Sequence, residues 1–139
     1  MVLAATNRPW DLDEAIRRRL EKRVYIPLPT HVGRKHLFSI NLKGIDLNED
    51  VDFDKLVAKT EGYSGADISN VCREAAMMPM RRKLMSASFN MEHLKNHQEE
   101  IEMPLTMSDF TEALNNISRS VSKDQLKEFE DWMAEYGAR

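Results

Sequence analysis

A chain of 139 residues is long enough for one domain with a modest core, or for the closing part of a larger protein. Its 20 Lys and Arg against 23 Asp and Glu give a formal net charge of -3, which excludes a general polyanion binder and restricts any basic surface to a local patch. The single cysteine excludes an internal disulfide, and the first apolar run is too short for a signal peptide or a membrane span. We therefore expect a soluble protein of the cytosol or nucleus.

Residues 1–29 predict the edge of an α/β layer. The chain opens directly in the apolar run "VLAA", residues 2–5, which predicts a short buried strand cut out of a larger sheet. "DLDE" predicts a helix start with Asp11 as N-cap and Glu14 completing a capping box. "KRVYIPLP", residues 22–29, predicts a second strand that two prolines end.

From Thr30 onward the periodicity is only helical, which predicts a small helical bundle. The first helix is expected to end near Gly44, and the second near Gly62 with Leu56 and Val57 on its buried face. The apolar face predicted for the first of these helices consists of Val32, His36, Leu37 and Ile40.

The segment "SGADISNVCREAAMMPMRRKL" is the strongest helical pattern in the chain. Ser64 and Asp67 have the spacing of a capping box, and Pro79 predicts a kink because it leaves the carbonyl of Ala75 without its usual partner. The predicted buried stripe consists of Ile68, Val71, Cys72, Ala75 and Met78.

Residues 86–105 are polar, with a weaker helical signal in "MEHLKNHQEEI". Two capped amphipathic helices follow, in "SDFTEALNNI" and "SKDQLKEFEDWMAEYG". The apolar side predicted for the last helix consists of Leu126, Phe129, Trp132, Met133 and Tyr136, and we interpret these aromatic residues as packing groups.

Three consecutive arginines, residues 17–19, close the first helical pattern. Ile16 and Leu20 share one face of that helix, so Arg18 points almost directly away from it. Two interpretations remain open: a solvated face paired with Asp13 and Glu21, or guanidinium groups presented to an anion on another molecule, such as a phosphate during transfer.

Two further patterns also have a structural and a functional interpretation. Asn7 follows a predicted strand, where an amide can orient a water molecule beside a phosphate, but it also suits a simple turn. In "GYSGAD", Ser64 and Asp67 are adequate as helix caps, while the glycines also let a ligand approach the backbone.

The remaining candidates favour structural interpretations. His93 and His97 have helical spacing but lack acidic or cysteine partners at metal-ligand spacing, so we predict no metal site. "RRRLEKR" and "MRRK" have acidic neighbours and no interleaved aromatic residues, which makes nuclear import or nucleic-acid binding a minority interpretation. The chain has no G-x-x-x-x-G-K-[ST] loop and no apolar strand ending in paired acids, so this chain alone should not hydrolyse ATP.

Taken in order, these segments resemble an AAA ATPase of the meiotic group. "LAATNRPWDLDEAIRRRLEKRVYIPLP" resembles the second region of homology, and "EGYSGADISNVCREAAMMPMRR" resembles the small helical domain that follows it. Trp10-Asp11, Leu20 within "RRRLEKR" and the terminal W-x-x-E-x-G pattern resemble the katanin catalytic subunit more than the vacuolar-sorting enzyme, which typically has Phe in place of Leu20.

The resemblance implies a role for several positions. Asn7 matches the sensor that holds the attacking water, and Arg18 and Arg19 match arginine fingers that reach the ATP of a neighbouring subunit. Asp67 stands where many other AAA+ proteins have a second sensor arginine, and this group has an acid there, so no charge-neutralising role is assigned to it. The positions that match the adenine and ribose side of the nucleotide are Leu37, Asn41, Gly65 and Ala66.

The implied fold is an α/β fragment, the end of an AAA+ P-loop sheet domain with two strands and a short helix, followed by a mostly α small helical domain and a C-terminal helix. The expected divisions are 1–29 for the end of the large subdomain, 30–85 for the small helical domain, 86–107 for a polar connection and 108–139 for the C-terminal helices. The phosphate-binding loop, the magnesium-binding acids, the pore loops and the microtubule-binding region are missing. The chain is therefore expected to be the C-terminal piece of a longer protein or a truncated gene product.

The intact enzyme that the resemblance implies is a ring, expected as a homo-hexamer, that uses ATP and Mg2+ to pull on tubulin and sever microtubules. The resemblance implies a cytoplasmic, cytoskeletal location at microtubules, spindle or centrosome. It also implies that one partner is a regulatory subunit of katanin, and it implies no nucleic acid and no membrane span. Two alternatives stay open: an ATPase that disassembles membrane-scission filaments, and a non-catalytic helical module that joins full-length subunits.

Overall fold

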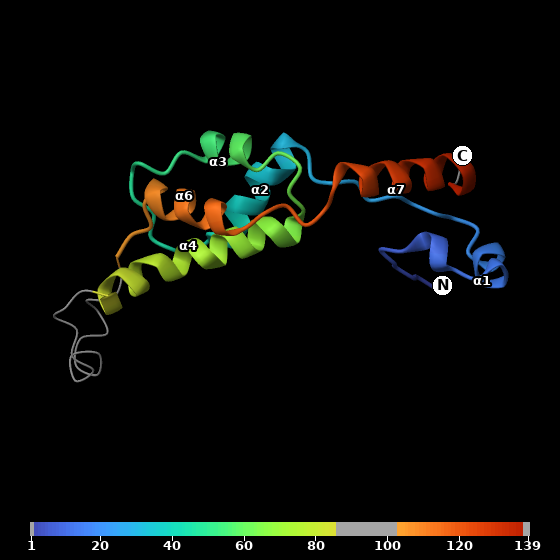
Figure 1. Cartoon of the computed structure of the whole chain (residues 1–139), viewed down its shortest axis with the longest axis horizontal. Helices are drawn as coiled ribbons and strands as arrows, with labels where there is room; N and C mark the ends of the chain where they lie inside the picture. The colour runs from blue at the N-terminus through green and yellow to red at the C-terminus, as the bar shows by residue number, and fades with distance from the viewer. Residues whose placement is uncertain (1, 86–102, 138–139) are drawn as a thin grey trace. The chain divides into compact units, whose positions relative to one another are not determined.

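The computed structural model describes residues 2–85 and 103–137. The chain forms two compact units: Met1–Pro27 together with Val121–Arg139, and Leu28–Ser120. Figure 1 shows the helices of each unit in chain order. Within the described residues, no helix is long and apolar enough to cross a membrane.

The first unit joins the two ends of the chain. It contains a 3-10 turn, η1 (Pro9–Asp11), the short helix α1 (Glu14–Arg19) and the C-terminal helix α7 (Lys123–Tyr136). Aromatic rings join α7 to η1 and to the segment after α1: the ring of Phe129 on α7 lies 5.0 Å from that of Trp10 and 6.0 Å from that of Tyr25. The aromatic side predicted for the last helix is therefore a packing surface, as expected.

The two predicted strands form no sheet in the described residues, and this part of the prediction is corrected. Residues 2–5 and 22–29 have no strand hydrogen bonds, and several of their apolar side chains face solvent, with Val2 83% and Ile26 86% exposed. A strand needs a neighbouring segment whose backbone exchanges hydrogen bonds with its own. An apolar run alone does not supply such a neighbour.

The start of α1 also differs from the prediction. Asp13, not Asp11, is the N-cap, and its carboxylate accepts the backbone N–H of Ala15 at 2.6 Å. Asp11 lies in the 3-10 turn and forms an ion pair with Arg8 at 2.7 Å. In "DLDE" two aspartates can cap a helix, and Pro9 sets a separate turn that uses the first of them.

The second unit is the expected helical bundle. It contains α2 (His31–Asn41), α3 (Phe53–Lys59), α4 (Gly65–Met85) and α6 (Met107–Asn116), with α6 and α2 packed against α4 (Figure 1). A backbone bridge joins Leu47 and Leu105. The shared core consists of Phe38, Leu42, Leu56, Val57, Ile68, Val71, Cys72, Ala75, Leu105, Phe110 and Ala113.

The strongest helical pattern is confirmed in detail. Ser64 N–H donates to the Asp67 carboxylate at 2.9 Å while Asp67 N–H donates to the Ser64 hydroxyl at 3.2 Å, which is a reciprocal capping box. The whole predicted stripe from Ile68 to Met78 is buried. The helix runs on through Pro79, and the kink expected there stays a prediction.

The predicted face of α2 is wrong except at Leu37, which packs against the core. Val32 is 76% exposed and Ile40 57% exposed, whereas Arg34, Phe38 and Leu42 are buried. The Arg34 guanidinium can be buried because it donates to the Val57 carbonyl at 3.2 and 3.3 Å and to the Pro29 carbonyl at 3.0 Å. A charged residue therefore takes the place in the core stripe that the pattern gave to apolar neighbours.

The later helices are capped as expected. Ser122 and Gln125 form a capping box at the start of α7, and the Asp109 carboxylate accepts the N–H of Thr106 at the start of α6. The helical signal predicted in "MEHLKNHQEEI", with His93 and His97, lies outside the described residues.

Candidate functional site

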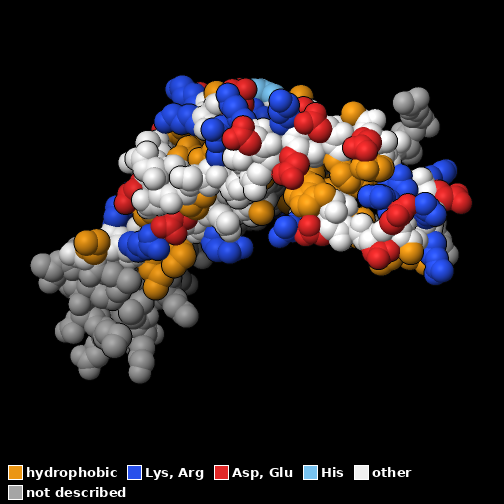
Figure 2. Space-filling model, turned by 45° about the vertical axis from the view of Figure 1, so that its right-hand side comes forward, with side chains coloured by type: hydrophobic (Ala, Val, Ile, Leu, Met, Phe, Trp, Pro, Cys, Tyr) orange, Lys and Arg blue, Asp and Glu red, His pale blue; other side chains and the backbone are white. Residues whose placement is uncertain are grey.

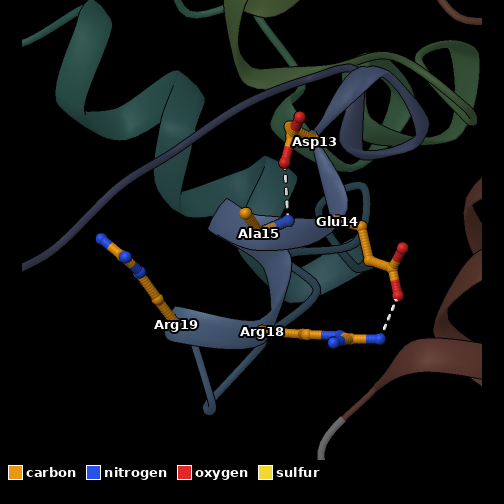
Figure 3. Close-up of a pocket in the computed structure, with 5 residues that line it drawn as sticks. All are labelled: Asp13, Glu14, Ala15, Arg18 and Arg19. Atoms are coloured by element: carbon orange, nitrogen blue, oxygen red, sulfur yellow. Dashed lines mark hydrogen bonds and ion pairs between the residues drawn. The ribbon is translucent and has the colours of Figure 1, made fainter.

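Helix α1 presents the three arginines in two different ways. Arg17 is half-buried, and its guanidinium lies 4.4 Å from the centre of the Tyr136 ring on α7. Arg18 and Arg19 are exposed and line an open pocket together with Asp13, Glu14 and Ala15 (Figure 3). One arginine therefore serves packing, and the other two face outward.

The acid that pairs with the outward arginines is not one that the sequence suggested. Arg18 forms an ion pair with Glu14 at 2.5 Å, while Asp13 caps the helix and Glu21 forms no ion pair within the described residues. The Arg18 and Glu14 side chains are 78% and 62% exposed, so water screens this pair and it contributes little to stability. The Arg19 side chain has no hydrogen bond or ion pair within the described part of the chain, and Figure 3 shows it directed away from Glu14.

Asn7 lies in a bend after residues 2–5 and is exposed. The turn is held by other groups: Arg8 N–H donates to the Thr6 hydroxyl at 3.0 Å, and Arg8 also pairs with Asp11. The Asn7 amide makes no hydrogen bond with the described residues, so the turn does not depend on it. Asn7 is also not among the residues that line the pocket of Arg18 and Arg19.

The four positions assigned to the base side of a nucleotide lie in the second unit, where α2 packs on the start of α4. A Cβ placed on Gly65 would lie 3.8 Å from Leu37 Cδ1, so these two residues are neighbours. The Asn41 amide donates to the Leu37 carbonyl at 2.8 Å, which uses one of its two N–H donors. Ala66 follows Gly65 at the first turn of α4 and is exposed.

Nothing in the folded chain requires glycine at position 65. Its φ is not positive, unlike those of Gly44 and Gly62, and an added Cβ would make only an ordinary van der Waals contact. Glycine placed where neither backbone conformation nor crowding requires it fits a position that a ligand approaches closely.

Asp67 places an ionised carboxylate at the start of α4. One carboxylate oxygen accepts the N–H of Ser64 at 2.9 Å and the N–H and hydroxyl of Ser120 at 3.1 and 3.0 Å. Burial raises the pKa of the Asp67 carboxyl, but these hydrogen bonds outweigh burial and leave the pKa below its ordinary value. A carboxylate therefore already occupies this helix N-terminus, which suits a neutral base or ribose at Gly65 better than a phosphate.

The two sets of candidate residues, one in each unit, suit different chemical groups. Two exposed guanidinium groups suit a phosphate, and the small residues at the start of α4 suit a base or sugar. Within the described residues, no three His, Cys, Asp or Glu side chains lie close enough to hold a metal ion.

Acidic and basic side chains are interspersed on the face shown in Figure 2.

Arg23 and Arg34 are the residues that sequence reasoning missed. Arg23 donates to the carbonyl oxygens of Arg17 and Tyr136, each at 2.5 Å, and Arg34 donates to the carbonyl of Val57 in α3. Both act on backbone atoms far along the chain, so no local pattern could have identified them.

Known families match most of the second unit and the end of the chain. Residues 50–96 match the AAA+ lid domain, and residues 85–137 match the Vps4 C terminal oligomerisation domain. A crystal structure of the FIGL-1 AAA domain in complex with ADP is similar, with a TM-score of 0.81 and 32% identity over 96% of this chain and 44% of that chain. The chain is thus similar to members of the AAA ATPase family, and the predicted fold class of an AAA+ fragment is confirmed.

Within that family the chain is similar to katanin subunits. It is 56% identical over 138 residues to the A-like 1 form of the katanin p60 ATPase-containing subunit from Danio rerio, and 53% identical to the protein of that name from Homo sapiens. Both matches cover 99% of this chain and 28% of the relative. A structure titled "Structural Basis for Katanin Self-Assembly" has a TM-score of 0.76 and 34% identity, covering 91% of this chain and 44% of that chain. The resemblance to the C-terminal portion of a katanin-type ATPase is thus confirmed.

Proposed function

We propose that this chain is the C-terminal part of a ring-forming ATPase that severs microtubules, and that it supplies Arg18 and Arg19 to the ATP of a neighbouring subunit. The observation that carries the proposal is the division of the three arginines on α1. Arg17 is held against Tyr136, whereas Arg18 and Arg19 stay exposed at one pocket. A helix that needed charge only for solubility would not require two adjacent guanidinium groups directed outward.

The chemistry of phosphoryl transfer gives these groups a role. Negative charge on the phosphoryl oxygens must be stabilised as the bond to the leaving group breaks, and a guanidinium offers paired donors and a permanent positive charge. The weak ion pair between Arg18 and Glu14 can exchange for a phosphate at small cost. Asn7, whose amide is not used by its own turn, would orient the attacking water.

The nucleotide itself would be ATP with Mg2+, held mainly by residues outside this chain. Leu37, Asn41, Gly65 and Ala66 would contact the base and ribose of the ATP bound to the same subunit. We expect the isolated chain to be inactive, since it has no G-x-x-x-x-G-K-[ST] loop.

The partners follow from the relatives. Katanin p60 ATPase-containing subunits are similar over this whole chain, and the match to an oligomerisation domain supports self-association, which we propose to be a homo-hexamer. Tubulin would be the substrate, and a further partner would be the regulatory subunit of katanin, with the protein at cytoplasmic microtubules, the spindle or the centrosome. Neither filament disassembly nor a free-standing interaction module is favoured, because the similar proteins are katanin p60 ATPase-containing subunits.

The test uses the full-length protein that contains this chain. We expect Arg18→Ala with Arg19→Ala to lower the kcat of ATP hydrolysis by about a hundredfold or more, and to abolish microtubule severing, with oligomers still formed. Lys22→Ala is the matched control, because Lys22 is an exposed basic residue of the same unit whose side chain has no hydrogen bond or ion pair in the described chain. An unchanged kcat in the double variant would remove the proposed role of both arginines.

A further inference from the structure

One guanidinium caps the C-terminal ends of two helices. Arg23 donates through one terminal nitrogen to the carbonyl of Arg17 in α1 and through the other to the carbonyl of Tyr136 at the end of α7, each at 2.5 Å. Both carbonyls belong to the last turn of their helix, where no intrahelical N–H is available to them. A cation at this place also opposes the negative end of both helix dipoles.

The same two helices meet a second time through side chains. The Arg17 guanidinium lies over the Tyr136 ring, 4.4 Å from its centre, which is the geometry of a cation–π contact. Tyr136 therefore contacts the arginine helix through its ring, and through its carbonyl by way of Arg23.

Helix α1 depends on such contacts because it cannot be stable alone. It has only six residues and none of them is buried, and Ile16 on its apolar face is 50% exposed. Isolated helices of this length are unstable in water, so tertiary contacts must supply the stability. The contacts to Arg23 and Tyr136 act on Arg17, directly before the two outward arginines.

We propose that Arg23 and Tyr136 are positioning residues that hold α1 against the C-terminal helix, so that Arg18 and Arg19 reach the neighbouring nucleotide only while α7 is docked. This inference rests on the proposed function of Arg18 and Arg19. Under this inference, docking of the C-terminal helix in one subunit would determine how fast the neighbouring subunit hydrolyses ATP. The end of α7 would thus act on turnover as well as on packing.

The first test replaces the Arg23 guanidinium, which donates to both carbonyls. In the full-length protein, Arg23→Gln is expected to lower kcat about tenfold and leave the KM for ATP unchanged, since a small displacement of a catalytic group is enough for such a loss. Arg23→Lys should restore only part of the activity, because one ammonium group cannot match the planar fork. Hydrogen exchange in residues 14–20 should become faster in Arg23→Gln and stay unchanged in the control Lys22→Gln.

The second test separates this inference from the proposed function by a double-mutant cycle. If Arg23 acts through the outward arginines, adding Arg23→Gln to the Arg18→Ala, Arg19→Ala variant should cause no further loss of kcat. A full additional tenfold loss would overturn the positioning role while leaving the arginine fingers in place. An unchanged kcat in the Arg18→Ala, Arg19→Ala variant would instead remove the proposed function.

Variants of Tyr136 test the same inference if the Arg23 variants fail to fold. Tyr136→Ala removes the cation–π contact and keeps the backbone carbonyl, and it should lower kcat in the same direction with a smaller effect. Tyr136→Phe keeps the ring and should behave as the parent protein. Equal activity of Tyr136→Ala and Tyr136→Phe would contradict the role of the ring.

Discussion

Asp67 and Ser120 are joined by two hydrogen bonds, from the Ser120 N–H at 3.1 Å and its hydroxyl at 3.0 Å to the same carboxylate oxygen. That oxygen also accepts the N–H of Ser64, so one acid both caps α4 and fixes the chain segment that follows α6. The Tyr63 hydroxyl donates to the Ile117 carbonyl at 2.7 Å and strengthens the same attachment. The acid at this position is therefore structural in the folded chain.

Replacing Asp67 by Asn should destabilise the second unit. The amide keeps one acceptor oxygen but loses the charge that strengthens three hydrogen bonds, so we expect the free energy of unfolding to fall by about 1–3 kcal/mol. Urea unfolding of the purified chain measures it. Glu112→Gln on the exposed side of α6 is the control and should change the free energy by less than about 0.5 kcal/mol. Equal midpoints for the two variants would contradict the role assigned to Asp67.

The stability of the chain should depend on pH through the same carboxylate. Its pKa in the folded chain lies below the ordinary value of 3.8, so the folded state binds fewer protons there than the unfolded state. The stabilisation is therefore complete above pH 3.8 and is lost as the pH falls through the folded-state pKa. Urea midpoints measured between neutral and acidic pH should fall less steeply for Asp67→Asn than for the parent chain, and parallel curves would show that other groups cause the loss.

Gly65→Ala distinguishes a ligand contact from a structural glycine. Because φ at Gly65 is not positive and the nearest side-chain atom is 3.8 Å from an added Cβ, the folded chain should tolerate alanine, with a gain in stability of up to about 1 kcal/mol. In the full-length protein the methyl group would meet the nucleotide and raise the KM for ATP. An unchanged KM in this variant would remove Gly65 from the proposed binding site.

Arg34 should be the most costly arginine of the second unit to remove. Arg34 is 8% exposed, and its guanidinium donates to the carbonyls of Val57 and Pro29. Arg34→Met therefore leaves buried acceptors without donors and should cost about 2 kcal/mol or more. The control Lys35→Met removes an exposed ion pair with Asp54 and should cost less than about 1 kcal/mol. Thermal unfolding of both variants of the purified chain decides the order, and a larger loss for Lys35→Met would contradict it.

The sequence predicted those parts of the fold whose information is local. The stripe from Ile68 to Met78 and the capping box at Ser64 follow from helical spacing and from residues three positions apart, and both are confirmed. Most of the buried face of α2 was missed because Arg34 is buried through a hydrogen bond to a carbonyl of α3. The spacing of apolar residues within α2 carries no information about that bond. The apolar runs at residues 2–5 and 22–29 have the composition of strands, but a strand also requires a partner.

The candidate site shows the same division between local and distant information. An outward Arg18 followed from the angular spacing on a short helix, and the structure shows Arg18 and Arg19 exposed. That Arg17 has a different role depends on Tyr136, and the Arg23 contact joins residues separated by 113 positions. The variants above test the roles of Arg18 and Arg19 in catalysis, and the role of Asn7 stays a prediction.

Cys72 offers a probe of α4 that needs no engineered label. Cys72 is 3% exposed, and burial raises the pKa of its thiol to about 12, so the reactive thiolate is on the order of 10⁻⁴ of the population at pH 8. We expect a thiol reagent to modify the folded chain at least about a hundredfold more slowly than the chain in urea. Since Cys72 is the single cysteine, all modification reports this site. The residual rate measures how often α4 opens, so it should rise in Asp67→Asn and stay unchanged in Glu112→Gln. Modification of the folded parent chain at the rate seen in urea would mean that the packing of α4 does not persist in solution.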